Sequence, residues 1–73
     1  MSVHQLDTLG MKSPKPVLRL ALIAPQMQQG DILEVVGDSP TFKKDICKWC
    51  ERLDRVVLGV EDEGRISRIR IQF

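Results

Sequence analysis

Apolar residues recur with two different periods along this chain, and the order of these periods strongly limits the folds that it can adopt. Two segments repeat apolar residues every three to four positions, which is typical of helices with one buried face. Three others alternate apolar and polar residues or are rich in β-branched residues, which indicates strands. An all-helical bundle of 73 residues would leave those strand-like segments without partners, so a mixed fold is expected.

A strand and a helix are predicted in the first part of the chain. Residues 3–9 form the strand, which closes at Gly10, and the Ser-Pro-Lys-Pro run at 13–16 opens the helix, because proline fits the first helical turn. Pro25 interrupts the helical hydrogen bonds, so we expect the helix to kink or tighten there and to end near Met27. The apolar stripe that should face the core comprises Val17, Leu18, Leu20, Ala21, Leu22 and Ala24.

A strand, a helix and a hairpin are predicted in the remainder. Residues 32–36 form a largely buried strand, and two strands around Gly64 form the hairpin. The helix between them has an apolar stripe made of Phe42, Ile46, Trp49, Cys50 and Leu53. The order βαβαββ and the right-handed crossover of parallel strand units predict an α+β fold, a two-layer α/β sandwich. We expect one domain over residues 1–73, with a mixed four-stranded sheet and two helices on one face.

Charge and hydropathy exclude two classes of protein. With 11 basic and 10 acidic residues the net charge is +1, so the chain lacks the global positive field of nonspecific nucleic-acid binders. Its longest apolar stretch, residues 20–25, is too short to span a bilayer, and its first residues do not form a secretory signal. The sequence therefore predicts a cytoplasmic protein without a membrane partner.

The motif that bears on chemistry lies in the loop that leads into the first helix. It reads Leu-Asp-Thr-Leu-Gly at 6–10, followed by Ser-Pro-Lys-Pro at 13–16. This pattern resembles the signature of the TusA/SirA family of sulfur carriers, an L-D-x-x-G segment that runs into C-P-x-P at the first helix. The resemblance continues through residues 27–31 and 37–46 and so covers nearly the whole chain.

The resemblance implies a sulfur carrier or sulfurtransferase that relays persulfide sulfur between proteins, in tRNA thiolation or in sulfur oxidation and trafficking. It implies persulfide donors and acceptors as partners, namely cysteine desulfurase, rhodanese or DsrE-like proteins, with tRNA involved only indirectly and with no cofactor. The acceptor cysteine of the family corresponds to Ser13. A hydroxyl cannot form a persulfide, so we expect this chain to be inactive as a carrier, whether the serine is native or engineered. The alternative is a noncatalytic protein-binding or RNA-binding module.

The candidate site surrounds position 13. A side chain at a helix start faces unpaired N–H groups, which stabilise a sulfur anion, and neighbouring basic side chains would add positive charge. Ser13 itself is interpreted as the helix N-cap, with its hydroxyl accepting the Lys15 N–H. Asp7 either caps the loop or orients the side chain at position 13, and the loop cap is our prediction. The candidate binding residues are Asp7, Gly10, Lys12, Pro14, Lys15, Pro16 and Arg19.

Two cysteines form a C-x-x-C pair, Cys47 and Cys50, a spacing that redox and zinc sites use. The pair follows about two turns of helix, whereas reactive pairs lie at a helix N-terminus. Only His4 would add another nitrogen or sulfur ligand. We therefore predict no metal site, a packing role for Cys50 and a flanking position for Cys47.

Three arginines, Arg65, Arg68 and Arg70, lie in or next to the last predicted strand, where isoleucines alternate with polar residues. The arginines are either a basic patch for an acidic protein or RNA, or the charged side chains that protect an edge strand from aggregation.

Overall fold

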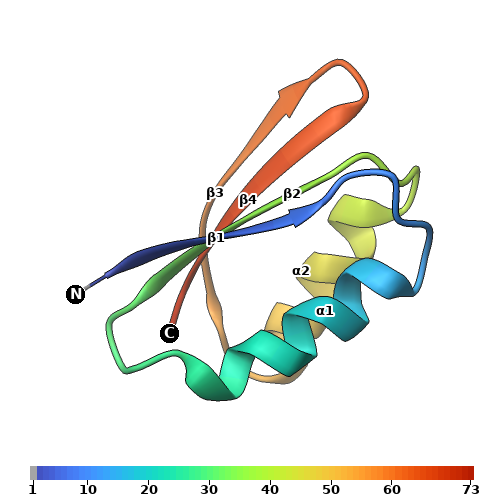
Figure 1. The fold of residues 1–73 in the computed structure, drawn as a ribbon. Coiled ribbons are helices and arrows are strands. Elements are labelled where there is room, and N and C mark those ends of the chain that lie inside the picture. Colours follow the sequence, from blue (N-terminus) through green and yellow to red (C-terminus); the bar gives the residue numbers. More distant parts are fainter. Residues whose placement is uncertain (1) are drawn as a thin grey trace.

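A computed structural model describes residues 2–73 and shows a sheet covered on one face by helices (Figure 1). The elements are β1 (Val3–Thr8), α1 (Lys15–Ile23), the 3-10 turn η1 (Ala24–Gln26), β2 (Ile32–Gly37), α2 (Phe42–Arg52), β3 (Val56–Glu63) and β4 (Ile66–Gln72). Both helices lie on the same side of the sheet, as predicted. Within residues 2–73, no helix has the length and apolar character needed to cross a membrane.

The four strands form one mixed sheet in the order β1-β2-β4-β3. β1 and β2 are parallel, with Leu6 opposite Val35, and the other two pairs are antiparallel. β4 therefore lies inside the sheet, between β2 and β3. The interpretation of its arginines as the protection of an edge strand is wrong, because β1 and β3 are the edge strands.

The hydrophobic core lies between the sheet and the helices. Alternate residues of β2 and β4 point into it, because successive side chains of a strand face opposite sides. The buried apolar residues are Leu6, Leu20, Leu33, Val35, Phe42, Ile46, Trp49, Cys50, Ile69 and Ile71. The packing roles predicted for Trp49 and Cys50 are confirmed by their membership of this cluster.

α1 buries a narrower stripe than its periodicity predicts. Pro16 and Leu20 are buried, whereas Leu18 is 57% exposed and Leu22 is 70% exposed. The assignment of these two leucines to the core stripe is wrong, because they lie on the side of the helix that faces away from the sheet. The expected tightening at Pro25 is confirmed, since α1 passes there into the 3-10 turn η1.

The face of the sheet opposite the helices carries a network of ion pairs. Glu34 lies 3.7 Å from both Arg68 and Arg70. Arg68 also pairs with Glu63 at 3.1 Å, and Arg70 pairs with Glu61 at 2.7 Å. The basic-patch interpretation is therefore wrong for these two arginines, because carboxylates on β2 and β3 neutralise them.

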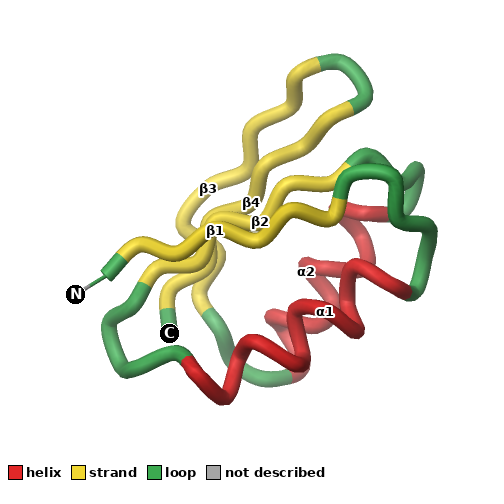
Figure 2. Tube along the Cα trace, in the orientation of Figure 1, coloured by secondary structure: helices red, strands yellow, loops and turns green. Residues whose placement is uncertain are grey.

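The β3–β4 hairpin extends past the helices, so one end of it is not covered by the helical layer (Figure 2). A register shift between Val57 and Gly59 marks a bulge in β3. The alternation of side chains along β3 is broken at this bulge, and Val56, Leu58 and Val60 are all exposed.

Candidate functional site

Ser13 lies in the loop before α1, and its side chain is exposed. Its Oγ donates a hydrogen bond to Asp45 Oδ2 at 2.9 Å. The helix begins at Lys15, its N-cap position is Pro14, and no side chain caps it. The Lys15 N–H donates to the Lys12 carbonyl at 2.9 Å instead. The prediction that Ser13 is the helix N-cap is therefore wrong, because its hydroxyl is bonded to another element.

Asp45 joins this site from the first turn of α2. Its Oδ2 accepts two hydrogen bonds, from Ser13 Oγ and from Thr41 Oγ1, each at 2.9 Å. Sequence reasoning missed Asp45 as a site residue, because it lies 32 positions beyond Ser13. The one local signal was an acid in the first turn of a predicted helix, where the helix dipole favours a negative charge.

A groove of about 190 Å³ runs between the start of α1 and the outer side of α2. Its lining consists of Ser13, Pro14, Val17, Asp45, Lys48, Trp49 and Arg52. The cations nearest to this groove are thus Lys48 and Arg52 of α2. Neither Lys48 nor Arg52 was predicted from the sequence as a site residue. The groove places both positive charge and the Asp45 carboxylate beside position 13.

The loop before Ser13 is held by two carboxylates. Asp7 Oδ1 accepts the Leu9 N–H at 2.8 Å, which is the predicted loop cap, and Asp45 rather than Asp7 bonds to the side chain at position 13. Gly10 has a φ of 77°, and its N–H donates to Asp38 Oδ1 at 2.9 Å. This bond fixes the loop to the segment between β2 and α2.

The remaining predicted site residues lie apart from the groove at Ser13. Lys12, Lys15 and Arg19 are exposed, whereas Pro16 is a buried residue in the first turn of α1. Lys15 and Arg19 line a different depression, of about 310 Å³, together with Met11, Leu18 and Leu22. The structure therefore separates the predicted site into a groove beside α2 and an outer surface on α1.

The two cysteines are free thiols on α2. Cys50 is buried, and burial first, then the neighbouring Cys47, raises the pKa of its thiol to about 11. A thiol in this environment is protonated at neutral pH and is a poor nucleophile. Neither cysteine lines the groove at Ser13. Within residues 2–73, no cluster of three or more His, Cys, Asp or Glu side chains is arranged to hold a metal ion.

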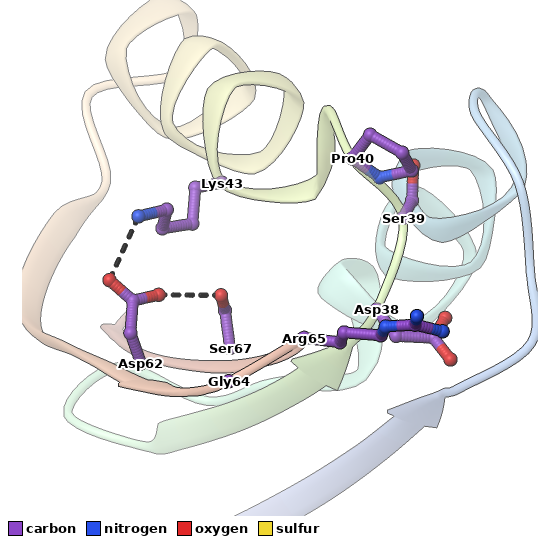
Figure 3. A pocket seen from close by; sticks show the side chains of 8 residues that line it. All are labelled: Asp38, Ser39, Pro40, Lys43, Asp62, Gly64, Arg65 and Ser67. Atoms are coloured by element: carbon purple, nitrogen blue, oxygen red, sulfur yellow. Dashed lines mark hydrogen bonds and ion pairs between the residues drawn. The ribbon is translucent and has the colours of Figure 1, made fainter.

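A larger hollow of about 620 Å³ lies between the β2–α2 loop and the β3–β4 turn (Figure 3). Lys43 Nζ pairs there with Asp62 Oδ2 at 2.9 Å, and Ser67 Oγ donates to Asp62 Oδ1 at 2.7 Å. The Lys43 hydrogen bond, followed by that of Ser67, lowers the pKa of Asp62 below its ordinary value. These three polar groups satisfy one another. Arg65 of the predicted basic patch lines the hollow, whereas the residues predicted around position 13 do not.

Two comparisons with known proteins agree with this architecture. The sequence model of the family described as Sulfurtransferase TusA matches residues 4–73. The crystal structure of a SirA-like protein from Desulfitobacterium hafniense is similar, with a TM-score of 0.78 and 21% sequence identity. That similarity covers 94% of this chain and 95% of the other, and it shows the shared fold. The match of the family model over nearly all of its length shows that this chain belongs to the TusA family of sulfurtransferases.

Proposed function

We propose that this chain acts in the cytoplasm as a single-domain docking member of a protein sulfur relay and that it does not itself carry sulfur. It binds persulfide donor or acceptor proteins around the loop formed by residues 10–16. The proposal depends on Ser13, the position to which the resemblance assigns the family's sulfur-accepting cysteine, and on the bond from its hydroxyl to Asp45. The family assignment supports a sulfur-carrier role at the level of the family.

The chemistry of the thiols supports the absence of sulfur loading. A persulfide forms when a thiolate attacks the sulfane sulfur of a donor persulfide and the donor leaves as a thiolate. Ser13 has no sulfur atom, and Cys50 is buried with a pKa of about 11. Cys47 is half-buried on α2, outside the groove at position 13. Neither cysteine is placed to replace the missing acceptor.

The loop keeps the features that a docking surface needs. Hydrogen bonds from the Leu9 and Gly10 N–H groups to Asp7 and Asp38 hold its backbone. Ser13, Pro14 and Lys15 remain exposed at its end. A partner can therefore reach position 13 without displacing any of the core.

Ser13→Cys tests this proposal directly. The variant is incubated with a cysteine desulfurase and free cysteine, and intact mass spectrometry with peptide mapping follows the addition of sulfur. We expect one or more sulfur atoms on the new thiol and none at residue 13 in the Ser13 protein. Hydroxyl and thiol side chains are similar in size, so the variant should fold normally, which circular dichroism would check.

Ser13→Ala is the matched control, because it removes the Asp45 hydrogen bond without adding sulfur. Its sulfur uptake should equal that of the Ser13 protein. The proposal would be overturned if the Ser13 protein gained sulfur efficiently at Cys47 or Cys50. It would also be overturned if Ser13→Cys folded but stayed unmodified by a donor that loads another TusA-family protein in the same assay.

A further inference from the structure

The outward face of α1 combines leucines with basic residues in one stripe. Lys15, Leu18, Arg19 and Leu22 follow at i, i+3, i+4 and i+7, the spacing that places side chains on one side of a helix. Leu18 is 57% exposed and Leu22 is 70% exposed, and together with Met11 they border a depression of about 310 Å³. Contiguous exposed apolar side chains are typical of surfaces that bind a partner.

The charge on this face is of one sign and is not compensated locally. From residue 8 to residue 30 the sequence contains no aspartate or glutamate, although the net charge of the whole chain is only +1. Among residues 2–73, Lys12, Lys15 and Arg19 take part in none of the ion pairs. The first turn of α1 holds Lys15 and no acid, although the helix dipole favours an acid there. Helix stability therefore does not explain these cations.

We infer that the face formed by Lys15, Leu18, Arg19 and Leu22, called the α1 face below, docks an acidic and amphipathic helix of a partner protein. The inference rests on the proposed function and deepens it, because it states the chemistry of the partner that position 13 meets. Leucines of the partner cover Leu18 and Leu22. Carboxylates beside them pair with Lys15 and Arg19, and Lys12 adds charge at the end nearer to the loop.

Other occupants fit this face less well. A second copy of the chain would offer the acidic run 61–63, but those carboxylates already pair with Lys43, Arg68 and Arg70. Single-stranded nucleic acid binds to basic grooves that carry aromatic side chains, and the α1 face contains none. Anionic lipid membranes attract basic helices, but stable attachment needs more buried apolar surface than two leucines provide.

The test uses the Ser13 protein and a fluorescent helical peptide that has leucine on one side and glutamate at the flanking positions. Fluorescence anisotropy measures binding at low salt and at about 0.5 M sodium chloride, and ¹⁵N NMR shifts locate the site. We expect saturable binding, a weaker affinity at high salt, and the largest shifts in residues 11–22. Peptides with lysine in place of glutamate, or serine in place of leucine, should bind at least tenfold more weakly.

Paired variants separate this face from general charge and hydrophobicity. Leu18→Gln/Leu22→Gln should weaken peptide binding at least tenfold, whereas Leu53→Gln/Leu58→Gln changes two other exposed leucines, outside α1, and should have no effect. Lys15→Gln/Arg19→Gln should remove most of the salt dependence of the affinity for the peptide. Its control, Lys44→Gln/Arg65→Gln, lowers the net charge by the same amount on exposed positions away from α1 and should leave binding unchanged.

The inference is overturned if binding of the acidic peptide does not saturate, or if the NMR shifts that the peptide causes lie outside α1. The same holds if the control variants weaken peptide binding as much as the variants of the α1 face do. It is also overturned if phosphatidylglycerol vesicles or a single-stranded RNA oligonucleotide bind to the same face more tightly than the peptide. None of these measurements involves sulfur. If Ser13→Cys takes up sulfur but the peptide does not bind, only the docking role of the α1 face is refuted. If the peptide binds but Ser13→Cys stays unmodified, only the sulfur-relay proposal is refuted.

Discussion

Asp45 Oδ2 lies 2.9 Å from the Ser13 hydroxyl, at the position to which the proposed function assigns the family's sulfur-accepting cysteine. A carboxylate at this distance disfavours a second negative charge, so we predict that it raises the pKa of the thiol introduced by Ser13→Cys. Adding Asp45→Asn to that variant should lower the thiol pKa by about 1 and speed alkylation at neutral pH. The pH dependence of iodoacetamide labelling at residue 13, followed by mass spectrometry, measures this pKa.

Glu51→Gln provides the control for Asp45→Asn. Glu51 is an exposed carboxylate on the same helix, and it does not line the groove at Ser13. Its removal should leave the labelling profile unchanged. A higher thiol pKa after Asp45→Asn would mean that the carboxylate does not oppose the anion at position 13.

Cys50 is expected to matter for stability rather than for redox chemistry. Its side chain is 1% exposed within the core, so the hydroxyl of Cys50→Ser would enter an apolar environment. We predict a loss of about 1 kcal/mol or more in the free energy of unfolding, measured by urea denaturation. Cys47→Ser, at the half-buried position one turn earlier, should cost less, and equal costs would contradict the packing role.

At the scale of the elements, Gly37 at the end of β2 determines how closely α2 can approach the sheet. A Cβ atom built on Gly37 would overlap the ring of Phe42, the first residue of α2. Gly37→Ala therefore forces the ring or the helix to move, and overpacking of this kind costs about 2 kcal/mol. Thermal and urea unfolding would measure the loss.

Gly59 offers the matched comparison within the same sheet. A Cβ atom there would meet only the end of the Arg70 side chain, at 3.4 Å. Arg70 is flexible enough to move, so Gly59→Ala should change the free energy of unfolding by less than about 0.5 kcal/mol. If both alanines had the same effect, contact with Phe42 would not be the reason for glycine at position 37.

The sequence predicted the order and type of the elements because each segment carries its own local periodicity. Exposure of Leu18 and Leu22 was not predictable in the same way. Periodicity shows which residues share a face of α1, but a helix this apolar does not reveal how wide a stripe the sheet covers. The interior place of β4 was also missed, because strand order depends on pairing between distant segments.

Only the parts of the candidate site that depend on contacts between neighbouring residues were predicted. The loop cap by Asp7 was predicted, because its carboxylate bonds to the N–H of Leu9, only two residues further along the chain. The bond from Ser13 to Asp45 joins the loop before α1 to α2 and was missed. The N-cap prediction for Ser13 used only the nearby backbone N–H groups as hydrogen-bond partners. It did not include a carboxylate that folding brings close from another element.

At the scale of the whole molecule, Asp31 ties the N-terminal segment to the loop before β2 and gives stability a dependence on pH. Its carboxylate accepts the Gln28 N–H at 2.9 Å and the Ser2 N–H at 3.1 Å, and it lies 3.4 Å from His4 Nε2. The Gln28 hydrogen bond is the main cause that lowers the pKa of Asp31 below its ordinary value. The folded protein thus binds this proton less readily than the unfolded chain does.

The sign of the pH effect follows from that difference. The stabilisation by Asp31 is present above about pH 4 and is lost as the pH falls through the lowered pKa. Asp31→Asn should therefore be less stable than the parent protein at pH 7. The gap between their free energies of unfolding should narrow toward about pH 2. Urea unfolding at several pH values measures the gap. An equal loss of stability at pH 7 and at about pH 2 would contradict the role of the Asp31 carboxylate.

β4 is the strand that joins the rest of the sheet, because β2 and β3 each pair with it and not with each other. It is also the last strand of the described chain. During synthesis β1, β2, both helices and β3 are therefore all made before the strand that connects β2 to β3. The sheet can close only after residues 66–72 have left the exit tunnel. Until then, the nascent chain exposes the unpaired edge of β2, the kind of surface that chaperones bind.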